Sequence, residues 1–278
     1  MTNEIYGIDY LRRRLADKQT RVLLRYKYYE MKNNAQDFSS LAPEKFKGLK
    51  ETVGWCAKAV DSLADRLQFD EFQNDEFNLS EIFLSNNQDI LIDSAVLSAL
   101  ISACSFVYIR EDNGYPRLQV IDGSNATGII DPVTNLLTEG YAVLERDSMG
   151  VVKTEAYFMA GMTEIYSHGV LVQRIPNAAP YALLVPIIYR PDAKRPFGHS
   201  RISRACIAYT QTALRTIKRS EVSAEFYSFP QKYVLGLSED AEFNNRLATI
   251  SSFLNFTKDG DGDHPIVGQF QQQSMTPY

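Results

Sequence analysis

The chain has 278 residues, of which 45% are hydrophobic and 23% are charged, which is the composition of an ordinary globular protein with a buried core. Its formal net charge is -5 at pH 7, so it lacks the overall positive charge with which repressors and histones attract DNA along a whole surface. Any contact with nucleic acid is therefore expected to be local.

The first third of the chain is predicted to be helical. Residues 4–33 and residues 46–69 form the first two candidate helices, and two shorter helices follow and end near Ala103. Pro43 precedes the second helix, where its fixed φ and missing N–H suit a first helical turn. Apolar residues recur along this helix at spacings of three and four and predict one packing face, formed by Val53, Ala57, Val60, Leu63, Ala64 and Leu67.

From Phe106 to Tyr189 the pattern changes to short segments rich in Val, Ile, Tyr and Thr. Turn signals such as DNGYP, DPVTN and SHG separate these segments, and Asn113-Gly114 is a strong signal for a two-residue hairpin. A meander of antiparallel strands is expected, and no internal repeat is evident. Because helices and strands are segregated along the chain, the predicted fold class is α+β.

A proline-rich joint, RPDAKRPFGHS, leads into the longest predicted helix, which Pro230 ends. A narrow apolar stripe is expected along this helix, formed by Ile202, Cys206, Tyr209, Ala213 and Ile217. Arg204, Arg215 and Arg219 fall on a different side of it. Its small residues would allow neighbouring helices to approach closely.

Residues 230–278 are expected to form a small α/β piece, with a strand after Pro230, a short acidic helix, an Asp/Gly loop and a strand at HPIVGQF. The chain stops at SMTPY, where Thr276-Pro277 is a helix-start signal. The natural polypeptide is therefore expected to continue past Tyr278.

The Asp/Gly loop TKDGDGDHPIVG places Asp259, Asp261 and Asp263 at alternate positions, as a calcium-binding loop does. The sixth position, where such a loop needs glycine, is His264, and the twelfth, where it needs glutamate, is Phe270. A hairpin loop without a bound cation is the favoured interpretation.

The cysteines and apolar runs point to no disulfide, metal or membrane span. Cys56, Cys104 and Cys206 are far apart and form no Cys-x-x-Cys pair, so we expect them to be small core residues. No cofactor is expected. The longest apolar stretch, AVLSALISACSFVYI, is shorter than the roughly 20 residues of a membrane span, and no apolar run for secretion follows the arginines at 12–14.

One stretch resembles part of a hydrolase motif. Residues 198–201, GHSR, match half of the nucleophile elbow G-x-S-x-G, without its second glycine or a preceding strand. A helix N-cap is the favoured role of Ser200, and a serine hydrolase that uses Ser200 with His199 or His264 is the alternative. The favoured interpretation is that the chain is not an enzyme.

The order of these parts is similar to that of one protein family. The segment PFGHSRISRACIAYTQTALRTIKRSEVSAEFYSFPQKYVLG resembles portal proteins of tailed double-stranded DNA phages, in the sub-group common in phages of Gram-positive bacteria. RYKYYEMKN, GYPRLQVIDGSNATGIIDP and GQFQQQSMTPY are similar to the same family. The resemblance covers nearly the whole chain through diffuse packing patterns, and another phage head protein remains an alternative.

By this resemblance, residues 1–195 are the wing, with helices in 1–104 and a β-rich part in 105–190. Residues 196–229 are the stem helix and residues 230–278 an incomplete clip, and the second stem helix, tunnel loop and crown are missing. Arg204, Arg215, Lys218 and Arg219 are expected to contact DNA or a neighbouring subunit, while a solvated basic face is the competing interpretation. The apolar stripe would pack between stem helices.

The family also implies a function and partners. Portal subunits assemble into a dodecameric ring at one capsid vertex of the virion, through which double-stranded DNA is packaged and ejected. The implied partners are other copies of the chain, the terminase large subunit, a head-completion adaptor, and the scaffolding and major capsid proteins. Assembly in the host cytoplasm without a membrane is expected.

Overall fold

The computed structural model of the chain describes residues 5–33, 51–228, 232–235 and 266–269. The chain divides into two compact units, Met1–Asn34 with Thr52–Thr212, and Ala35–Glu51 with Ala213–Tyr278. The predicted helix start at Pro43, the acidic helix, the Asp259–263 loop and the signal at Thr276-Pro277 lie outside the described residues.

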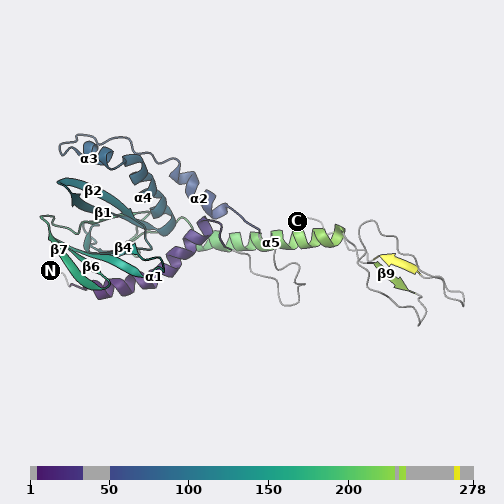
Figure 1. Cartoon of the computed structure of the whole chain (residues 1–278). Helices are drawn as coiled ribbons and strands as arrows, with labels where there is room; N and C mark the ends of the chain where they lie inside the picture. The colour runs from purple at the N-terminus through teal and green to yellow at the C-terminus, as the bar shows by residue number, and fades with distance from the viewer. Residues whose placement is uncertain (1–4, 34–50, 229–231, 236–265, 270–278) are drawn as a thin grey trace. The chain divides into compact units, whose positions relative to one another are not determined.

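Among the described residues, four helices precede the strands, which confirms the helical prediction for that part of the first third (Figure 1). They are α1 (Ile8–Tyr29), α2 (Trp55–Ala64), α3 (Leu79–Ser85) and α4 (Gln88–Ser102). The second helix is shorter than predicted. It begins after Gly54. Just beyond Ala64, two hydrogen bonds span three residues instead of four, as in a 3₁₀ turn: Arg66 N–H donates to Leu63 O at 3.1 Å and Leu67 N–H to Ala64 O at 3.0 Å.

Eight strands follow and form two antiparallel sheets, in the orders β2-β1-β8 and β3-β4-β5-β6-β7. They are β1 (Cys104–Asp112), β2 (Tyr115–Ile121), β3 (Ala126–Ile130), β4 (Leu137–Arg146), β5 (Val152–Met159), β6 (Met162–Ser167), β7 (Val170–Pro176) and β8 (Leu184–Ile188). The predicted α+β class is confirmed. The predicted single meander is correct for β3 to β7. It is wrong for β1, β2 and β8, which form a separate sheet in which β8 pairs with β1, and Leu184 of β8 fills the core between the two sheets.

The hairpin between β1 and β2 forms at the predicted residues. Asn113 and Gly114 have φ values of 53° and 82°, the left-handed pair that a two-residue turn of type I′ requires. Asp112 and Tyr115 pair on either side of the turn and set the register of the two strands.

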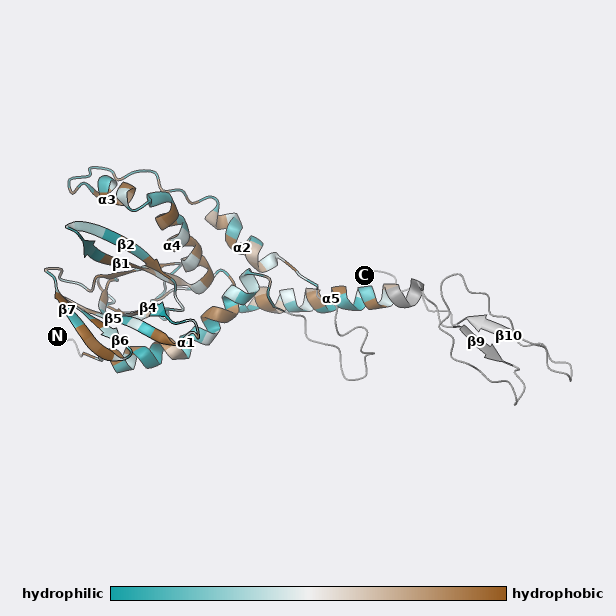
Figure 2. Ribbon diagram, in the orientation of Figure 1, coloured by the Kyte–Doolittle hydropathy of each residue, from teal (hydrophilic) through white to brown (hydrophobic). Residues whose placement is uncertain are grey.

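The first unit is layered, with the two sheets face to face and a helix on each outer side (Figure 1). Phe106, Phe158 and Leu184 are fully buried between the sheets. On one outer side Ser105 Oγ donates to Ala95 O of α4 at 2.7 Å. On the other side Leu11 and Leu15 of α1 pack on the five-stranded sheet. Figure 2 shows that α1 carries both hydrophobic and hydrophilic residues along its length.

The longest helix, α5 (Arg204–Ser228), begins eight residues later than the predicted range 196–229. The turns before it are held by serines, and Ser203 Oγ accepts from Cys206 N–H at 3.1 Å, so Ser203 and not Ser200 caps the helix. Two short antiparallel strands, β9 (Lys232–Leu235) and β10 (Ile266–Gln269), confirm the strands predicted in that part. None of the helices in the described ranges has the length and apolar character of a membrane span.

Candidate functional site

Three consecutive strands carry the pattern Thr-Glu-x-Tyr, at residues 138–141 in β4, 154–157 in β5 and 163–166 in β6. The pattern is four residues long and recurs in neighbouring strands of one sheet. Residues two apart in a strand point to the same side, so each Glu and Tyr face the same way. The three glutamates are buried, with exposed fractions of 4%, 4% and 8%.

The first glutamate holds the start of α1. Glu139 Oε1 accepts from Tyr6 N–H at 2.9 Å, and Glu139 Oε2 accepts from Gly7 N–H at 3.0 Å and from the Tyr157 hydroxyl at 2.6 Å. A carboxylate at a helix N-terminus also stabilises the positive end of the helix dipole. Glu139 therefore fixes where α1 begins on the sheet.

The second glutamate binds α1 one turn further on. Glu155 forms an ion pair with the Arg12 guanidinium and accepts a hydrogen bond from the Tyr141 hydroxyl. Arg12 Nη1 also forms an ion pair with Asp9 Oδ1 at 2.7 Å. The bond to Glu155 is the main reason that the pKa of Arg12 is raised above its usual value.

The tyrosines of the Thr-Glu-x-Tyr pattern have pKa values raised above that of an ordinary tyrosine. Burial, followed by the hydrogen bond to Glu164, raises the pKa of Tyr166 to about 12. Burial and the bonds to glutamate also raise the pKa values of Tyr141 and Tyr157. Each of these glutamates already accepts hydrogen bonds, and α1 covers the first two of them, so the arrangement positions a helix and offers no open catalytic carboxylate.

The predicted apolar stripe of α5 divides into buried and exposed members. Ile202 is 1% exposed and Cys206 is half-buried, and both pack in the first unit against Val60 and Leu100. Tyr209 and Ile217 are exposed, at 69% and 38%. The buried positions are instead Ile202, Thr210, Leu214 and Lys218, and half-buried Cys206 continues their spacing of four; Ala213 is also half-buried.

The basic residues predicted on one side of α5 differ in their exposure. Arg204, Arg215 and Arg219 are exposed, as a surface that contacts DNA or a neighbouring subunit requires. Lys218 is 1% exposed, which differs from the prediction of a common basic face because it lies on the buried line of the helix. The contacts themselves stay predictions.

The structure brings together two cysteines that are 150 residues apart. Cys56 Sγ lies 3.3 Å from Cys206 Sγ and 3.4 Å from Thr210 Oγ1, and both thiols are free. Burial raises the pKa of Cys206 to about 11 and keeps the thiol protonated. Cys56 and Cys104 are buried, as predicted for small core residues.

The hydrolase alternative lacks its geometry in the described residues. Ser200 Oγ donates to Ile101 O at 2.6 Å and accepts from Ile202 N–H at 3.0 Å, so it holds a turn. His199 points elsewhere, with Nε2 2.6 Å from Asp192 Oδ2 and Nδ1 3.3 Å from an Arg195 nitrogen. This bond to His199 is the main reason that the pKa of Asp192 is lowered. His264 lies outside the described residues.

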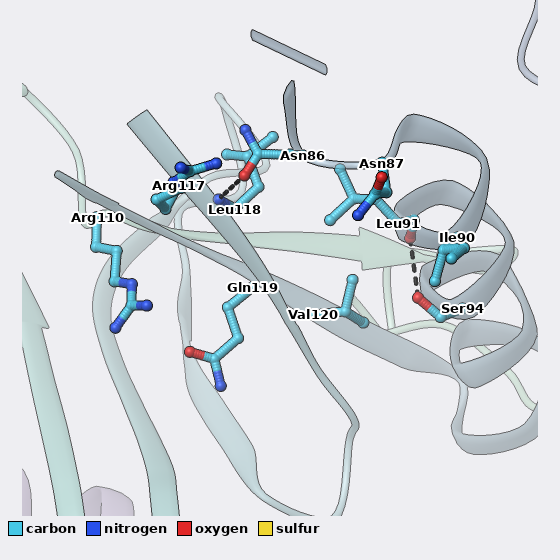
Figure 3. A pocket seen from close by; sticks show the side chains of 10 residues that line it. All are labelled: Asn86, Asn87, Ile90, Leu91, Ser94, Arg110, Arg117, Leu118, Gln119 and Val120. Carbon is cyan, nitrogen blue, oxygen red and sulfur yellow. Dashed lines mark hydrogen bonds between the residues drawn. The ribbon is translucent and has the colours of Figure 1, made fainter. Parts of the chain in front are cut away.

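A cavity of about 400 Å³ lies beside β2, at the edge of the three-stranded sheet (Figure 3). Residues from β1, β2, α4 and the turn between α3 and α4 line it: Asn86, Asn87, Ile90, Leu91, Ser94, Arg110, Arg117, Leu118, Gln119 and Val120. Arg110 and Arg117 are directly opposite each other in the register of β1 and β2. Like charges so placed repel, and an anionic group between them would relieve the repulsion. Only the pairing of the strands reveals this arrangement.

No group of three or more His, Cys, Asp or Glu in the part of the chain that the structure describes could hold a metal ion. The chain matches no protein-family model and no curated protein. Its function must therefore be argued from the fold, the exposed surfaces of α5 and the sheet edges.

Proposed function

We propose that the chain is a portal subunit of a tailed phage, which forms a ring at the capsid vertex through which double-stranded DNA is packaged and ejected. The observation that carries the proposal is α5, a helix of 25 residues that follows a layered α+β unit and bears exposed apolar residues. This helix is about twice the mean length of about 11–12 residues for helices in globular proteins.

The exposed side of α5 supports contacts between copies of the chain. Tyr209 is 69% exposed and Ile217 is 38% exposed, although both are large and apolar. They are eight residues apart on the helix, about 80° beyond two full turns, so both fall within one broad side of it. In a closed ring, the same helix of a neighbouring subunit would cover this face.

The edge strand β7 supports the same conclusion. All seven of its residues are exposed, and Val170, Val172 and Leu171 are exposed at 68%, 66% and 37%. Proteins normally cover or charge such an apolar edge, because it invites pairing with another chain. A neighbouring subunit would supply that cover.

Charge supports a channel more than a tight DNA-binding site. The net charge is -5, and Arg204, Arg215 and Arg219 are the exposed basic residues predicted to contact DNA or a subunit. Each phosphate contact strengthens binding, so few contacts suit a passage through which DNA slides. The terminase large subunit, the head-completion adaptor, and the scaffolding and major capsid proteins would bind the assembled ring.

Sedimentation velocity over a range of protein concentrations tests the proposal. The chain is expected to form large closed oligomers, and Tyr209→Ser is expected to shift them towards monomer. Leu84→Ser is the matched control, because Leu84 is an equally exposed apolar residue, at 69%, outside α5. Equal sedimentation of the two variants would show that Tyr209 of α5 does not contribute to the contact between subunits.

A further inference from the structure

The outer side of β2 is an open sheet edge. Asp112 and Tyr115 close the hairpin, so hydrogen-bonded pairs alternate from there and include Arg110 with Arg117 and Tyr108 with Gln119. The main-chain groups of the intervening residues 116, 118 and 120 therefore point away from β1. Position 116 is a proline, which loses no ladder bond there because its missing N–H would face outward.

One side chain already occupies part of this edge in the way that a neighbouring strand would. Asn86 Oδ1 accepts from Leu118 N–H at 3.0 Å, and Asn86 Nδ2 donates to Pro116 O at 3.1 Å. The next outward groups, Leu118 C=O and Val120 N–H, have no hydrogen-bond partner among the described residues. The cavity of about 400 Å³ lies along these groups.

The two sides of the cavity differ in chemistry. Leu118 and Val120 face α4, as do the residues of β1 that they pair with, and Ile90 and Leu91 line the cavity from that helix. Ile90 is 71% exposed, so this apolar side is open. Figure 3 shows Ile90 on α4 and, on the other side of the strands, Arg110 and Gln119.

The charge on the second side is positive. Arg110 forms no hydrogen bond or ion pair in the part of the chain that is described, and none of the ten residues that line the cavity is acidic. Arg117 Nη1 donates to Ser85 O at 3.1 Å, and its Nε lies 3.9 Å from Asp112. Arginine binds carboxylates in a planar, paired geometry, so acidic side chains suit this position.

We propose that the open edge of β2 binds an extended peptide segment whose residues alternate between apolar and acidic side chains. The segment adds as a further strand, with its backbone on Leu118 C=O and Val120 N–H. Because successive side chains of a strand point to opposite faces, the apolar ones enter beside Ile90 and the acidic ones reach Arg110. This edge would bind such a segment whether or not the chain forms rings.

Fluorescence anisotropy with the whole chain tests this site. The probe is a short acetylated and amidated peptide that alternates valine and glutamate, and the control peptide has lysine in place of glutamate. The acidic peptide is expected to bind and the basic one is not. Hydrogen exchange of the Val120 amide is expected to slow in the complex, because that amide would gain its acceptor.

Variants separate the backbone contact from the charge contact. Val120→Pro deletes the outward N–H without removing a ladder bond, whereas Val120→Ala also removes the valine side chain but keeps the N–H. Val120→Pro is therefore expected to bind about fivefold more weakly than Val120→Ala, and this difference isolates the main-chain contact. Arg110→Glu is expected to weaken binding about fivefold at low salt. Lys58→Glu, which reverses an exposed charge on α2, is its matched control.

Two results would overturn the proposal. One is an acidic peptide that binds no better than the basic one. The other is binding that Val120→Pro leaves unchanged while thermal unfolding shows the variant to be folded, since the peptide would then lie elsewhere. Weaker binding by Val120→Pro than by Val120→Ala, together with a fall in affinity for Arg110→Glu and none for Lys58→Glu, assigns the segment to this edge.

Discussion

The outer face of the five-stranded sheet and the open edge of β2 use polar groups in opposite ways. Beneath α1, Glu139 and Glu155 are 4% exposed, and tyrosine, arginine and main-chain donors bind them. At β2 the outward groups Leu118 C=O and Val120 N–H have no partner among the described residues, and Arg110 is exposed. The first region is closed around its own helix, whereas the second is prepared for another chain.

This difference has an energetic consequence. A buried polar group costs free energy when its partner is removed, whereas an exposed one is solvated and costs little. Substitutions beneath α1 should therefore change stability. Substitutions on the β2 edge and on the outer side of α5 should change binding or assembly and leave the fold intact.

Raising the pH is expected to have the largest effect on the tyrosine–glutamate contacts beneath α1. The pKa of Tyr166 is raised to about 12, and those of Tyr141 and Tyr157 are raised too, whereas tyrosine in an unfolded chain titrates near about 10. The unfolded chain then releases protons first, so stability that is fully present below about pH 10 is lost as the pH rises through the folded-state values. Urea denaturation at a series of pH values should show the free energy of unfolding falling above about pH 10.

The same experiment has an internal control. Tyr157→Phe removes one of the titrating groups, so its free energy of unfolding should fall less steeply with pH than that of the original chain. Parallel profiles would show that Tyr157 does not contribute, and a flat profile for both chains would contradict the account of the network.

Arg12→Ala is expected to have the next largest effect. It leaves the Glu155 carboxylate buried without its ion pair, which should lower the free energy of unfolding by about 3 kcal/mol. Asp9→Ala removes only the exposed outer partner of the same arginine and should cost less than about 0.5 kcal/mol. Equal losses in urea denaturation would show that α1 is not held through Glu155.

Tyr157→Phe at neutral pH is expected to have a smaller effect. It deletes the hydroxyl that donates to Glu139 at 2.6 Å and should cost about 1 kcal/mol. Tyr181→Phe is the control, because Tyr181 is 42% exposed and its hydroxyl forms no hydrogen bond within the described residues. Thermal unfolding of both variants measures the difference, and an unchanged midpoint for Tyr157→Phe would refute this role of the hydroxyl.

The smallest change in stability is expected on α5. Arg215→Glu combined with Arg219→Glu alters two exposed side chains and should change the free energy of unfolding by less than about 0.5 kcal/mol. Oligomer formation or DNA packaging should nevertheless be lost if these arginines contact a subunit or DNA. Unchanged assembly and packaging would instead assign them to a solvated basic face.

The sequence predicts the elements of this fold better than their contacts. Local signals such as Asn113-Gly114 and the long segment before Pro230 are correct, because turn and helix propensities act over a few residues. The pairing of β8 with β1 depends on which residues fill the core, so local alternation does not reveal it. The start of α5 at Arg204 follows from Ser203 as the cap, one of several serines that could serve.

The candidate sites show the same limit. The repeated Thr-Glu-x-Tyr pattern is visible in the sequence, but its meaning depends on three strands lying side by side. Cys56 and Cys206 are in contact although 150 residues separate them, which no spacing rule predicts. On α5 the buried line passes through Thr210 and Lys218, because packing selects positions by geometry even where the side chain is polar.

Native mass spectrometry of the purified chain over a range of concentrations tests the central claim most directly. The proposed portal function predicts a closed oligomer of about twelve subunits with a discrete mass, since cyclic symmetry ends in a defined number. A chain that stays monomeric at every concentration would contradict it.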